Sequence, residues 1–161
     1  MDLEYTIRVA ETTDLDTLVD FTTRESRETE GDDPDAAAVA VGVRAGLEGS
    51  APATYWVAES RNGEVVGSIS VVTEWSNFRG GYYWWVQSLF IVPEHRGSGL
   101  VELMLTTIAD AARTAGALDL RLYVLQSNQR AVAAYRRCGF EVAPYSIMTR
   151  HLETPRERVE G

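Results

Sequence analysis

Lysine is absent from the 161-residue chain, cysteine occurs once and histidine occurs twice. The 15 basic residues are therefore all arginine, against 24 acidic residues, and the net charge is −9 with a pI near 4.7. An acidic surface repels phosphate backbones, so we do not expect nucleic acid as a partner. The acidity has two readings: it attracts a cationic substrate, or it keeps the chain soluble in a salty cytoplasm. Because the acidic residues are spread along the chain, the second reading is favoured.

The scarcity of cysteine and histidine leaves little material for disulfides or metal sites. Cys138 has no partner for an internal disulfide, which fits a reducing cytoplasm, and neither His95 nor His151 has the spacing of a metal ligand. Residues 1–10 have no basic-then-apolar signal pattern, and no apolar run approaches the roughly 20 residues that a membrane span requires. We therefore expect a cytoplasmic protein without a metal ion and without a membrane contact.

The hydrophobic fraction of 45% is enough to fill one core. Residues 1–152 are expected to form a single domain, followed by a charged tail over 153–161. The apolar periodicities predict an α/β (α+β) domain, with a mixed sheet of about seven strands and helices on its faces. The expected strands span 5–9, 53–59, 64–74, 82–92, 118–125, 140–143 and 145–152, and the expected helices begin near 12 and 34 and span 100–116 and 129–138.

Turn residues set the expected boundaries in the first half of the chain. Residues 24–35 are charged and are interrupted by glycine and proline, so a loop is expected there. Pro34 suits the first position of the second helix, with Asp33 as its N-cap. Asn62-Gly63 predicts a hairpin, because both residues tolerate positive φ.

The segment over residues 89–101 carries the most chemical information. A strand is stopped by Pro93, a turn containing Gly97 and Gly99 follows, and a helix begins at once. Small residues let the backbone approach a ligand, and the first N–H groups of a helix are unpaired. These N–H groups and the helix dipole favour an anion such as phosphate, and Arg96 adds a positive charge. The alternative is a tight strand-to-helix turn without a ligand.

Two nucleotide-binding motifs are excluded for this turn. The dinucleotide fingerprint G-x-G-x-x-G lies in the first βαβ unit and has a third glycine, whereas this turn is the sixth connection and lacks that glycine. The phosphate-binding loop of nucleotide hydrolases needs a lysine, and the chain has none.

Two motifs resemble those of the GNAT N-acetyltransferase superfamily. Residues 96–101, Arg-Gly-Ser-Gly-Leu-Val, are similar to the Q/R-x-x-G-x-G/A motif that binds acetyl-CoA. Residues 128–140 are similar to the family segment N-x-x-A-x-x-x-Y-x-x-x-G-F. The motifs occur in the family's order and spacing, and the expected element order over 5–152 also matches. The resemblance implies the acyl-CoA N-acyltransferase fold with a mostly antiparallel, twisted sheet, and an acetyl-CoA-dependent N-acetyltransferase activity.

The resemblance also implies roles for single residues. Backbone N–H groups of the turn would hold the CoA diphosphate, and the long strand, splayed from its neighbour by a bulge, would bind the pantetheine arm and polarise the thioester carbonyl. Tyr135 would protonate the departing thiolate, its alternative being a core aromatic, and Asn128 would bind the pantetheine or a nearby water. The implied cofactor-binding residues are Leu89, Phe90, Ile91, Arg96, Gly97, Ser98, Gly99, Leu100, Val101 and Asn128, and the implied catalytic residue is Tyr135.

Two places depart from the family pattern. Val101 stands where the family usually has glycine or alanine, and its side chain could crowd the cofactor. Gln87 and Ser88 occupy strand positions where many relatives carry a glutamate that helps to deprotonate the amine. The general base is therefore unidentified from the sequence.

A base or its equivalent is required, because deprotonating a lysine-like amine at pH 7 costs about 4.6 kcal/mol. The candidates are Glu25, Glu28, Glu74 and a water held by Gln87 or Ser88. Each carboxylate has the alternative of being a solvated surface acid. Direct transfer in a ternary complex needs no nucleophile, so the single cysteine is interpreted as a small core residue.

The acceptor site is expected to lie between the acidic residues 24–35 and the aromatic residues around 75–85. Acids and aromatics would suit a small primary amine, an amino acid derivative or a peptide N-terminus. The alternative is that the aromatics alternate between the core and a homodimer surface. Besides an active N-acetyltransferase, the sequence leaves open a non-catalytic acyl-CoA-binding or sensor module and a structural partner subunit.

Overall fold

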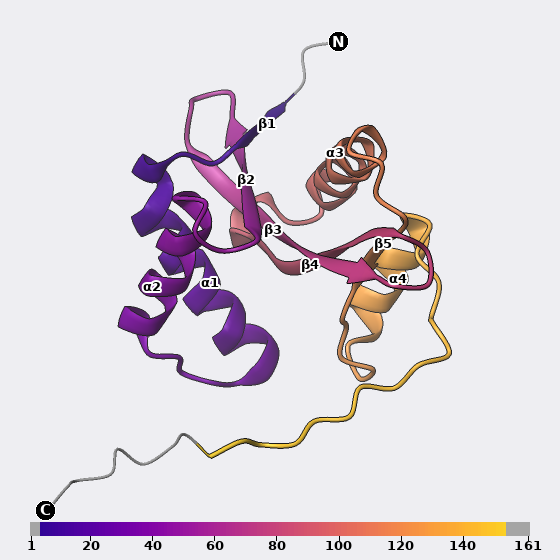
Figure 1. Ribbon diagram of the computed structural model, residues 1–161. Helices are drawn as coiled ribbons and strands as arrows, with labels where there is room; N and C mark the ends of the chain where they lie inside the picture. Colours follow the sequence, from indigo (N-terminus) through magenta and orange to yellow (C-terminus); the bar gives the residue numbers. More distant parts are fainter. Residues whose placement is uncertain (1–3, 154–161) are drawn as a thin grey trace, which may run out of the picture.

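The computed structural model describes residues 4–153 (Figure 1). Two consecutive α-helices follow the first strand, three consecutive strands come next, and the last strand lies between two helices. The elements are β1 (Tyr5–Val9), η1 (Thr12–Asp14), α1 (Leu15–Glu30), α2 (Ala36–Leu47), β2 (Ala53–Ser60), β3 (Val65–Ser76), β4 (Gly81–Ile91), η2 (Pro93–His95), α3 (Leu100–Thr114), β5 (Leu120–Leu122) and α4 (Gln129–Arg137). Among the described residues, no helix is long and apolar enough to cross a membrane.

The sheet contains the strands in chain order, β1-β2-β3-β4-β5. Neighbouring strands are antiparallel, except that β5 runs parallel to β4. This confirms the predicted mixed, mostly antiparallel sheet, although residues 4–153 contain five strands and not seven. Helices α1 and α2 cover one face and α3 covers the other, so the sheet lies between two helical layers (Figure 1).

The larger core lies between α3 and the sheet. Leu100, Met104 and Ile108 recur every fourth residue along α3, and their exposed fractions are 1%, 0% and 0%. They pack against strand residues such as Ile69 and Val86. Full burial of each such side chain contributes roughly 1.5–3 kcal/mol, so this apolar stripe fixes α3 on the sheet.

A second core lies under α1 and α2. Leu18 of α1, Val43 of α2 and Val57 of β2 are buried together. Because side chains of a strand alternate between faces, Val57 points to this core while Trp56 and Ala58 join the larger one. Successive residues of β2 therefore anchor the two helical layers in turn.

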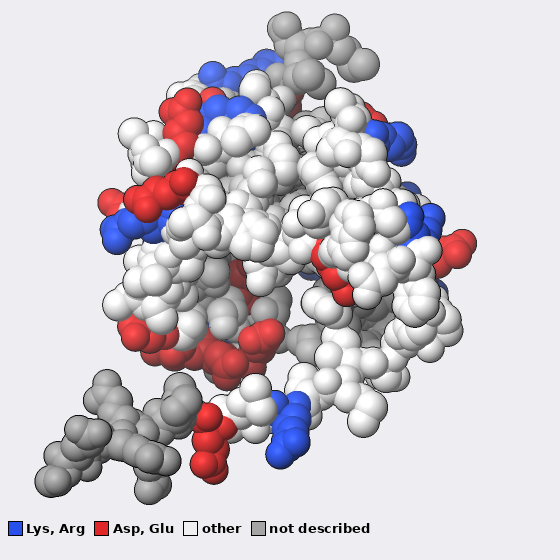
Figure 2. All heavy atoms as spheres, viewed as in Figure 1, with Lys and Arg blue, Asp and Glu red and all other residues white. Residues whose placement is uncertain are grey.

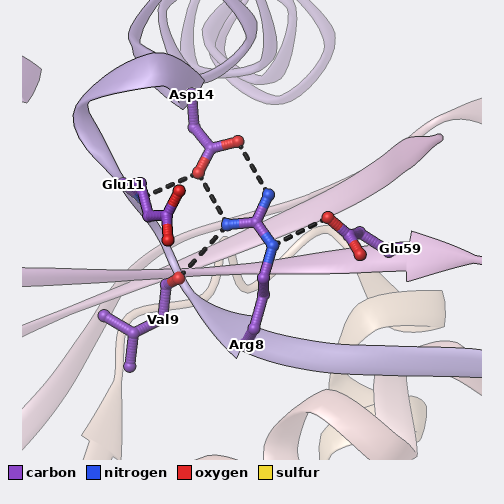
Figure 3. Close-up of polar contacts among 5 residues, drawn as sticks. All are labelled: Arg8, Val9, Glu11, Asp14 and Glu59. Atoms are coloured by element: carbon purple, nitrogen blue, oxygen red, sulfur yellow. Dashed lines mark hydrogen bonds and ion pairs between the residues drawn. The ribbon is translucent and has the colours of Figure 1, made fainter. Parts of the chain in front are cut away.

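An ion-pair network ties the first strand to the turn that follows it (Figure 3). The Arg8 guanidinium lies between Asp14, at 2.8 Å, and Glu59 of β2, at 2.7 Å. The buried Asp14 carboxylate also accepts the backbone N–H of Glu11 at 2.7 Å, closing a capping box at the start of η1. This network fixes where α1 begins relative to the sheet.

The first helix is longer than predicted, because residues 24–30 belong to α1 and not to a loop. Arginine and glutamate are good helix formers, and Arg24 pairs with Asp20 one turn earlier at 3.4 Å. Gly31 ends the helix with φ +71°, a conformation that side chains rarely adopt. The predicted loop is therefore confined to residues 31–35, which contain the glycine and the proline.

The second helix also begins later than predicted. Its N-cap is Asp35, whose carboxylate accepts the N–H of Ala37 at 3.0 Å, and Pro34 lies before the cap. Asp33, the predicted cap, instead pairs with Arg27 at the end of α1. The hairpin between β2 and β3 and the helices α3 and α4 lie where the sequence predicts them.

The two strands predicted for 140–143 and 145–152 do not form, and β5 is only three residues long. Residues 141–153 are exposed along their whole length and run away from the sheet as an extended segment (Figure 1). Pro144 lacks the N–H that a ladder needs, and within the described chain no strand lies beside this segment. Of the predicted charged tail, residues 154–161 lie outside the described residues.

Candidate active site

Strand β4 carries a bulge in its second half. Its pairing with β3 slips where Ser70 faces Ser88 but Val71 faces Val86, so Gln87 is the extra residue. Its parallel pairing with β5 ends at Val86. Beyond that point β4 continues beside β3 alone, and its other edge borders a gap. The splayed strand implied by the resemblance is therefore present in the described structure.

The turn before α3 presents open backbone. Gly97 and Gly99 have φ values of +76° and +82°, and a Cβ placed on either would meet no atom within 4 Å. Gly99 is the N-cap of α3 and no side chain caps the helix. The first N–H groups of α3 therefore face open space, next to the positive end of the helix dipole.

The turn is fastened to the first strand. The Tyr5 hydroxyl lies 2.9 Å from His95 Nδ1 and 3.3 Å from Ser98 Oγ, and the Ser98 hydroxyl donates to the His95 carbonyl at 2.7 Å. His95 therefore contributes to the structure of the loop. These contacts hold the glycine turn rigidly at the end of β4.

A cavity of about 320 Å³ lies on the α1 face of the sheet, beside the bulge. Its wall is rich in hydroxyl groups and contains two carboxylates. It is lined by Thr22, Glu25, Ser26, Thr29, Glu30, Val39, Gly42, Val43, Tyr55, Ser70, Gln87 and Ser88. Within residues 4–153, no three His, Cys, Asp or Glu side chains are grouped to hold a metal ion.

Glu25 reaches from α1 to the free edge of β4. Its Oε1 accepts the backbone N–H of Leu89 at 3.0 Å, two residues after the bulge. Burial raises the pKa of this carboxyl to about 7, the Leu89 N–H opposes the rise, and Glu30 and Glu28 add to it. The cavity thus contains a carboxyl group that titrates near neutrality, which is the property of a proton acceptor.

Tyr135 is a residue of α4. It packs against the core on the α3 face, with its ring 6.0 Å from that of Phe140. Burial raises the pKa of its hydroxyl, and the negative charge of Glu25 raises it further. The Glu25 carboxyl and the Tyr135 phenol therefore lie within electrostatic range of each other.

Comparison with known proteins agrees with this geometry. The model of the acetyltransferase (GNAT) family matches residues 15–140. The chain belongs to the GNAT family. It is 34% identical over 96 residues to streptothricin acetyltransferase of Streptomyces lavendulae, which is 59% of this chain and 49% of that protein. The chain therefore matches about half the length of this relative.

Solved structures of GNAT proteins share the fold. The structure of a possible acetyltransferase from Clostridium difficile 630 is 28% identical, with a TM-score of 0.87 over 94% of this chain and 100% of that one. An aminoglycoside N-acetyltransferase in complex with CoA is 14% identical, with a TM-score of 0.76 over 91% and 94% of the two chains. The latter likeness is one of fold alone.

The residues of the first GNAT motif lie together, but Arg96 has its own partners. Its guanidinium donates to the Ile91 carbonyl and to Glu28, both at 2.8 Å, and so lies along the turn. Leu100 is buried, and Val101 packs against the larger core. The Val101 side chain is therefore partly buried against that core.

The residues of the second GNAT motif have structural partners as well. The Asn128 Oδ1 caps α4 by accepting the N–H of Ala131 at 3.1 Å, a role that the sequence analysis did not assign. Cys138 packs against the core, as predicted, and burial raises the pKa of its thiol, which disfavours the nucleophilic thiolate.

Of the predicted proton acceptors, only Glu25 and the pair Gln87 and Ser88 line the cavity. Glu28 pairs with Arg96 at the surface. Glu74 accepts the indole N–H of Trp85 at 2.8 Å and does not line the cavity.

The aromatic residues around 75–85 do not line this cavity, and their predicted part in an acceptor site stays a prediction. The ring of Trp75 packs on Tyr82, and that of Trp85 stacks on Tyr123. The chain's own Arg121 lies 3.5 Å from the centre of the Tyr83 ring. These aromatics stabilise the outer half of the sheet.

Most of the hydroxyl groups of the cavity were not predicted from the sequence. Tyr55 of β2 and Ser70 of β3 join Ser88 there, and the Ser70 and Ser88 hydroxyls are hydrogen-bonded. For Ser70 and Ser88, the only sign in the sequence was a small polar residue within a largely apolar strand. Thr22, Ser26 and Thr29 lie three or four residues apart on α1, a spacing that places them on one helix face.

Proposed function

We propose that the protein is an acetyl-CoA-dependent N-acetyltransferase that transfers acetyl directly to an amine in a ternary complex. The observation that carries the proposal is the Leu89 N–H. It points out of β4 into the gap beside β5, where it donates to a side chain and not to a strand. A fixed N–H at this place suits the oxygen of a thioester on which negative charge develops.

The described residues fit the CoA part of the co-substrate. The N–H groups over 97–101 would hold the diphosphate, because the glycine turn leaves open space beside it and the helix dipole favours an anion. Residues 89–91 would bind the pantetheine arm through the free edge of β4. The side chain of Arg96 is held by Glu28, so backbone groups supply most of the diphosphate contact.

Tyr135 supplies the acid of the reaction in this proposal. When the carbon–sulfur bond breaks, the thiolate takes the phenolic proton. The raised pKa keeps the phenol protonated at neutral pH, so it is available as a donor. Its electrostatic proximity to Glu25, which accepts the Leu89 N–H, supports this role.

The acceptor in this proposal is a small primary amine, an amino acid derivative or a peptide N-terminus. Glu25 and Glu30 line the cavity, and no basic side chain is among its lining residues, so an ammonium group is the charge that fits. Acidic side chains also gather over the lower end of the α1 and α2 layer (Figure 2). The names of two similar proteins, streptothricin and aminoglycoside acetyltransferases, support a small acceptor. Action in a reducing cytoplasm is in keeping with the single cysteine.

The test is release of free CoA thiol in the presence of a panel of amines. Thiol release that depends on both an amine and acetyl-CoA supports the proposal. Binding of acetyl-CoA without thiol release for any amine would favour the non-catalytic acyl-CoA module instead. A thermal shift caused by CoA separates both from a structural subunit that binds no cofactor.

A further inference from the structure

The first inference concerns Glu25 and rests on the proposed function. We propose that Glu25 is the general base and that it competes with the thioester for one hydrogen bond. In the free enzyme the Glu25 carboxylate accepts the Leu89 N–H, and in the complex with acetyl-CoA the thioester oxygen accepts that N–H instead. The two atoms are 3.0 Å apart, and Glu25 comes from a helix, not from the strand position at which the family usually has its glutamate. A single N–H makes one strong hydrogen bond, so the carboxylate and the thioester compete for it.

Displacement changes the proton affinity of the carboxyl group. The Leu89 N–H stabilises the charged form, so its loss raises the pKa of Glu25 above its value of about 7 in the free protein. A group whose pKa rises on binding takes up a proton when the ligand binds. Acetyl-CoA affinity is therefore expected to fall as the pH rises through about 7.

The charges that face Glu25 set this behaviour. On its own helix they are Glu28 and Glu30, which raise its pKa. Tyr135 of α4 lies within electrostatic range, and Tyr55 of β2 lines the cavity, but both are neutral near pH 7. The residues of α2, β3 and β4 that line the cavity have no charge. An incoming ammonium ion supplies a positive charge, lowers the pKa of Glu25 and releases to solvent the proton that was taken up with acetyl-CoA. The carboxylate that remains can accept a proton from the amine.

The transfer balances with these two groups. Glu25 accepts one proton of the ammonium group, the carbon–nitrogen bond forms and the carbon–sulfur bond breaks. The sulfur takes the proton of Tyr135, and a second proton from the nitrogen replaces it. The products are the amide, the free thiol of CoA and one proton, which leaves from Glu25 to solvent.

Calorimetry of acetyl-CoA binding in two buffers with different heats of ionisation tests the competition. The wild type should take up protons near neutral pH, more with acetyl-CoA than with CoA, which lacks the acetyl carbonyl. Glu25→Gln should bind acetyl-CoA without proton uptake and with an affinity that does not change with pH. Asp20→Asn on the same helix is the matched control and should behave as the wild type. In turnover, Glu25→Gln should lose about 100-fold or more, together with the rate dependence near pH 7.

The outcomes separate this inference from the proposed function. Failure of the wild type to bind acetyl-CoA overturns both. Binding with equal proton uptake in the wild type and Glu25→Gln overturns the inference and leaves the proposed function standing. Turnover of Glu25→Gln within threefold of the wild type overturns the role of base.

An independent observation concerns the C-terminal arm, defined as residues 141–153. Within the described chain the arm makes no backbone hydrogen bond, and all of it is exposed. Five of its side chains are large and apolar, with exposed fractions from 64% to 94%. They are Val142, Tyr145, Ile147, Met148 and Leu152. An extended apolar segment without partners is unfavourable in water, so the arm needs a surface to cover it.

We infer that this surface is the free edge of β5 in a second copy of the chain. Within residues 4–153, β5 is paired only with β4, and Tyr123 and Leu125 just beyond it are 61% and 50% exposed. The arm runs away from its own sheet and so does not reach its own β5 in this conformation (Figure 1). A strand is predicted from the sequence over 145–152, and a strand can complete an edge through backbone hydrogen bonds.

Exchange between two copies is self-complementary. Each copy offers one arm and one edge, so a two-fold axis satisfies both at once. A buried aromatic side chain alone covers about 150–250 Å², and two arms with five large apolar side chains each exceed the roughly 1,000 Å² that a specific interface needs.

Light scattering on the full chain tests the exchange. A dimer is expected, and the exposed double variant Tyr145→Asp, Ile147→Asp should be a folded monomer with an unchanged far-UV spectrum. In hydrogen exchange, arm amides should be protected in the dimer and lose protection on dilution. A monomer with a protected arm, which has folded onto its own β5, would overturn the inference, as would a monomer whose arm exchanges freely. A dimer that survives the double variant would also overturn it.

Discussion

Arg8 donates to both carboxylate oxygens of Asp14, with nitrogen–oxygen distances of 2.8 and 3.0 Å. Asp14 is 6% exposed and also accepts the N–H of Glu11. The hydrogen bond from Arg8 is the main reason why the pKa of Asp14 lies below its ordinary value, and burial opposes the effect. The pair joins β1 to the start of α1, and thereby helps to place the helix that carries Glu25.

Asp14→Asn is expected to destabilise the protein by about 2 kcal/mol, because it weakens charged hydrogen bonds at a buried position. Asp20→Asn, which removes an exposed pair on the same helix, should cost less than about 0.5 kcal/mol. The lowered pKa of Asp14 stabilises the fold at pH values above the unfolded pKa of about 3.9. This stabilisation is lost as the pH falls through the pKa of Asp14 in the folded protein. Urea unfolding at neutral and acidic pH measures both effects. If the difference in unfolding free energy between the two variants is the same at neutral and at acidic pH, the pairing of Arg8 with Asp14 is contradicted.

Gly46 and Gly42 of α2 are expected to respond to alanine in opposite directions. A Cβ on Gly46 would lie 2.6 Å from Tyr55 Cε2 and 3.3 Å from Ala53 Cβ, whereas a Cβ on Gly42 meets nothing within 4 Å. Gly42→Ala should therefore stabilise the protein by up to about 1 kcal/mol. Gly46→Ala should destabilise it by roughly 1–3 kcal/mol, because the ring that lines the cavity must move. Thermal unfolding with the same sign for both variants would show that α2 does not pack on β2 in this way.

Gly99→Ala is expected to weaken acetyl-CoA binding by roughly tenfold or more, equivalent to about 1.4 kcal/mol. The methyl group enters the open space of the turn, and the positive φ adds strain. Gly116→Ala is the control, because Gly116 has φ +75° and open surroundings but follows the far end of α3. Calorimetric titration should find a weakened affinity for the first variant only. Equal affinities in both variants would remove the turn from the binding site.

Tyr135→Phe should lower kcat more than about tenfold and leave the acetyl-CoA affinity nearly unchanged. The ring still packs against Phe140, so the fold is retained, and only the proton donor is lost. Steady-state kinetics with thiol detection measures the split between kcat and KM. An unchanged kcat would return Tyr135 to the role of a core aromatic.

Glu25→Gln should stabilise the free protein at neutral and higher pH. The pKa of Glu25 is about 7 in the fold against an ordinary value of 4.5. Because the folded pKa is raised, the unfolded chain releases its proton first, and stability falls as pH rises from about 4.5 to about 7. The variant lacks this loss, so its advantage in melting temperature should grow across that interval. An advantage that does not change with pH would mean that Glu25 is not buried as the structure has it.

The sequence predicted the elements that have a strong local signal. The apolar stripe of α3, the Asn62-Gly63 hairpin and the glycine turn all lie where periodicity and turn chemistry placed them. The splay of β4 was implied by the family motifs alone, since nothing in the order of Val86, Gln87 and Ser88 marks a bulge. That the described elements form one domain, as the composition suggested, stays a prediction.

Non-local contacts explain what the sequence left open. Glu25 lies 64 positions before Leu89 and looked like one of many acids in a charged stretch, because its burial depends on how α1 packs against β4. The aromatics around 75–85 looked like an acceptor site, but the turn between β3 and β4 places them at the outer end of the sheet. Asn128 caps its own helix, and its implied contact with the pantetheine stays a prediction.

The central claim is that acetyl-CoA lies along β4 with its diphosphate at the start of α3. Titration of ¹⁵N-labelled protein with acetyl-CoA, followed through its amide resonances, tests this most directly. The account predicts saturable shifts at Leu89 and at residues 97–101. CoA should shift residues 97–101 in the same way and Leu89 much less. Resonances that do not saturate, or that shift only in another part of the protein, would contradict the account.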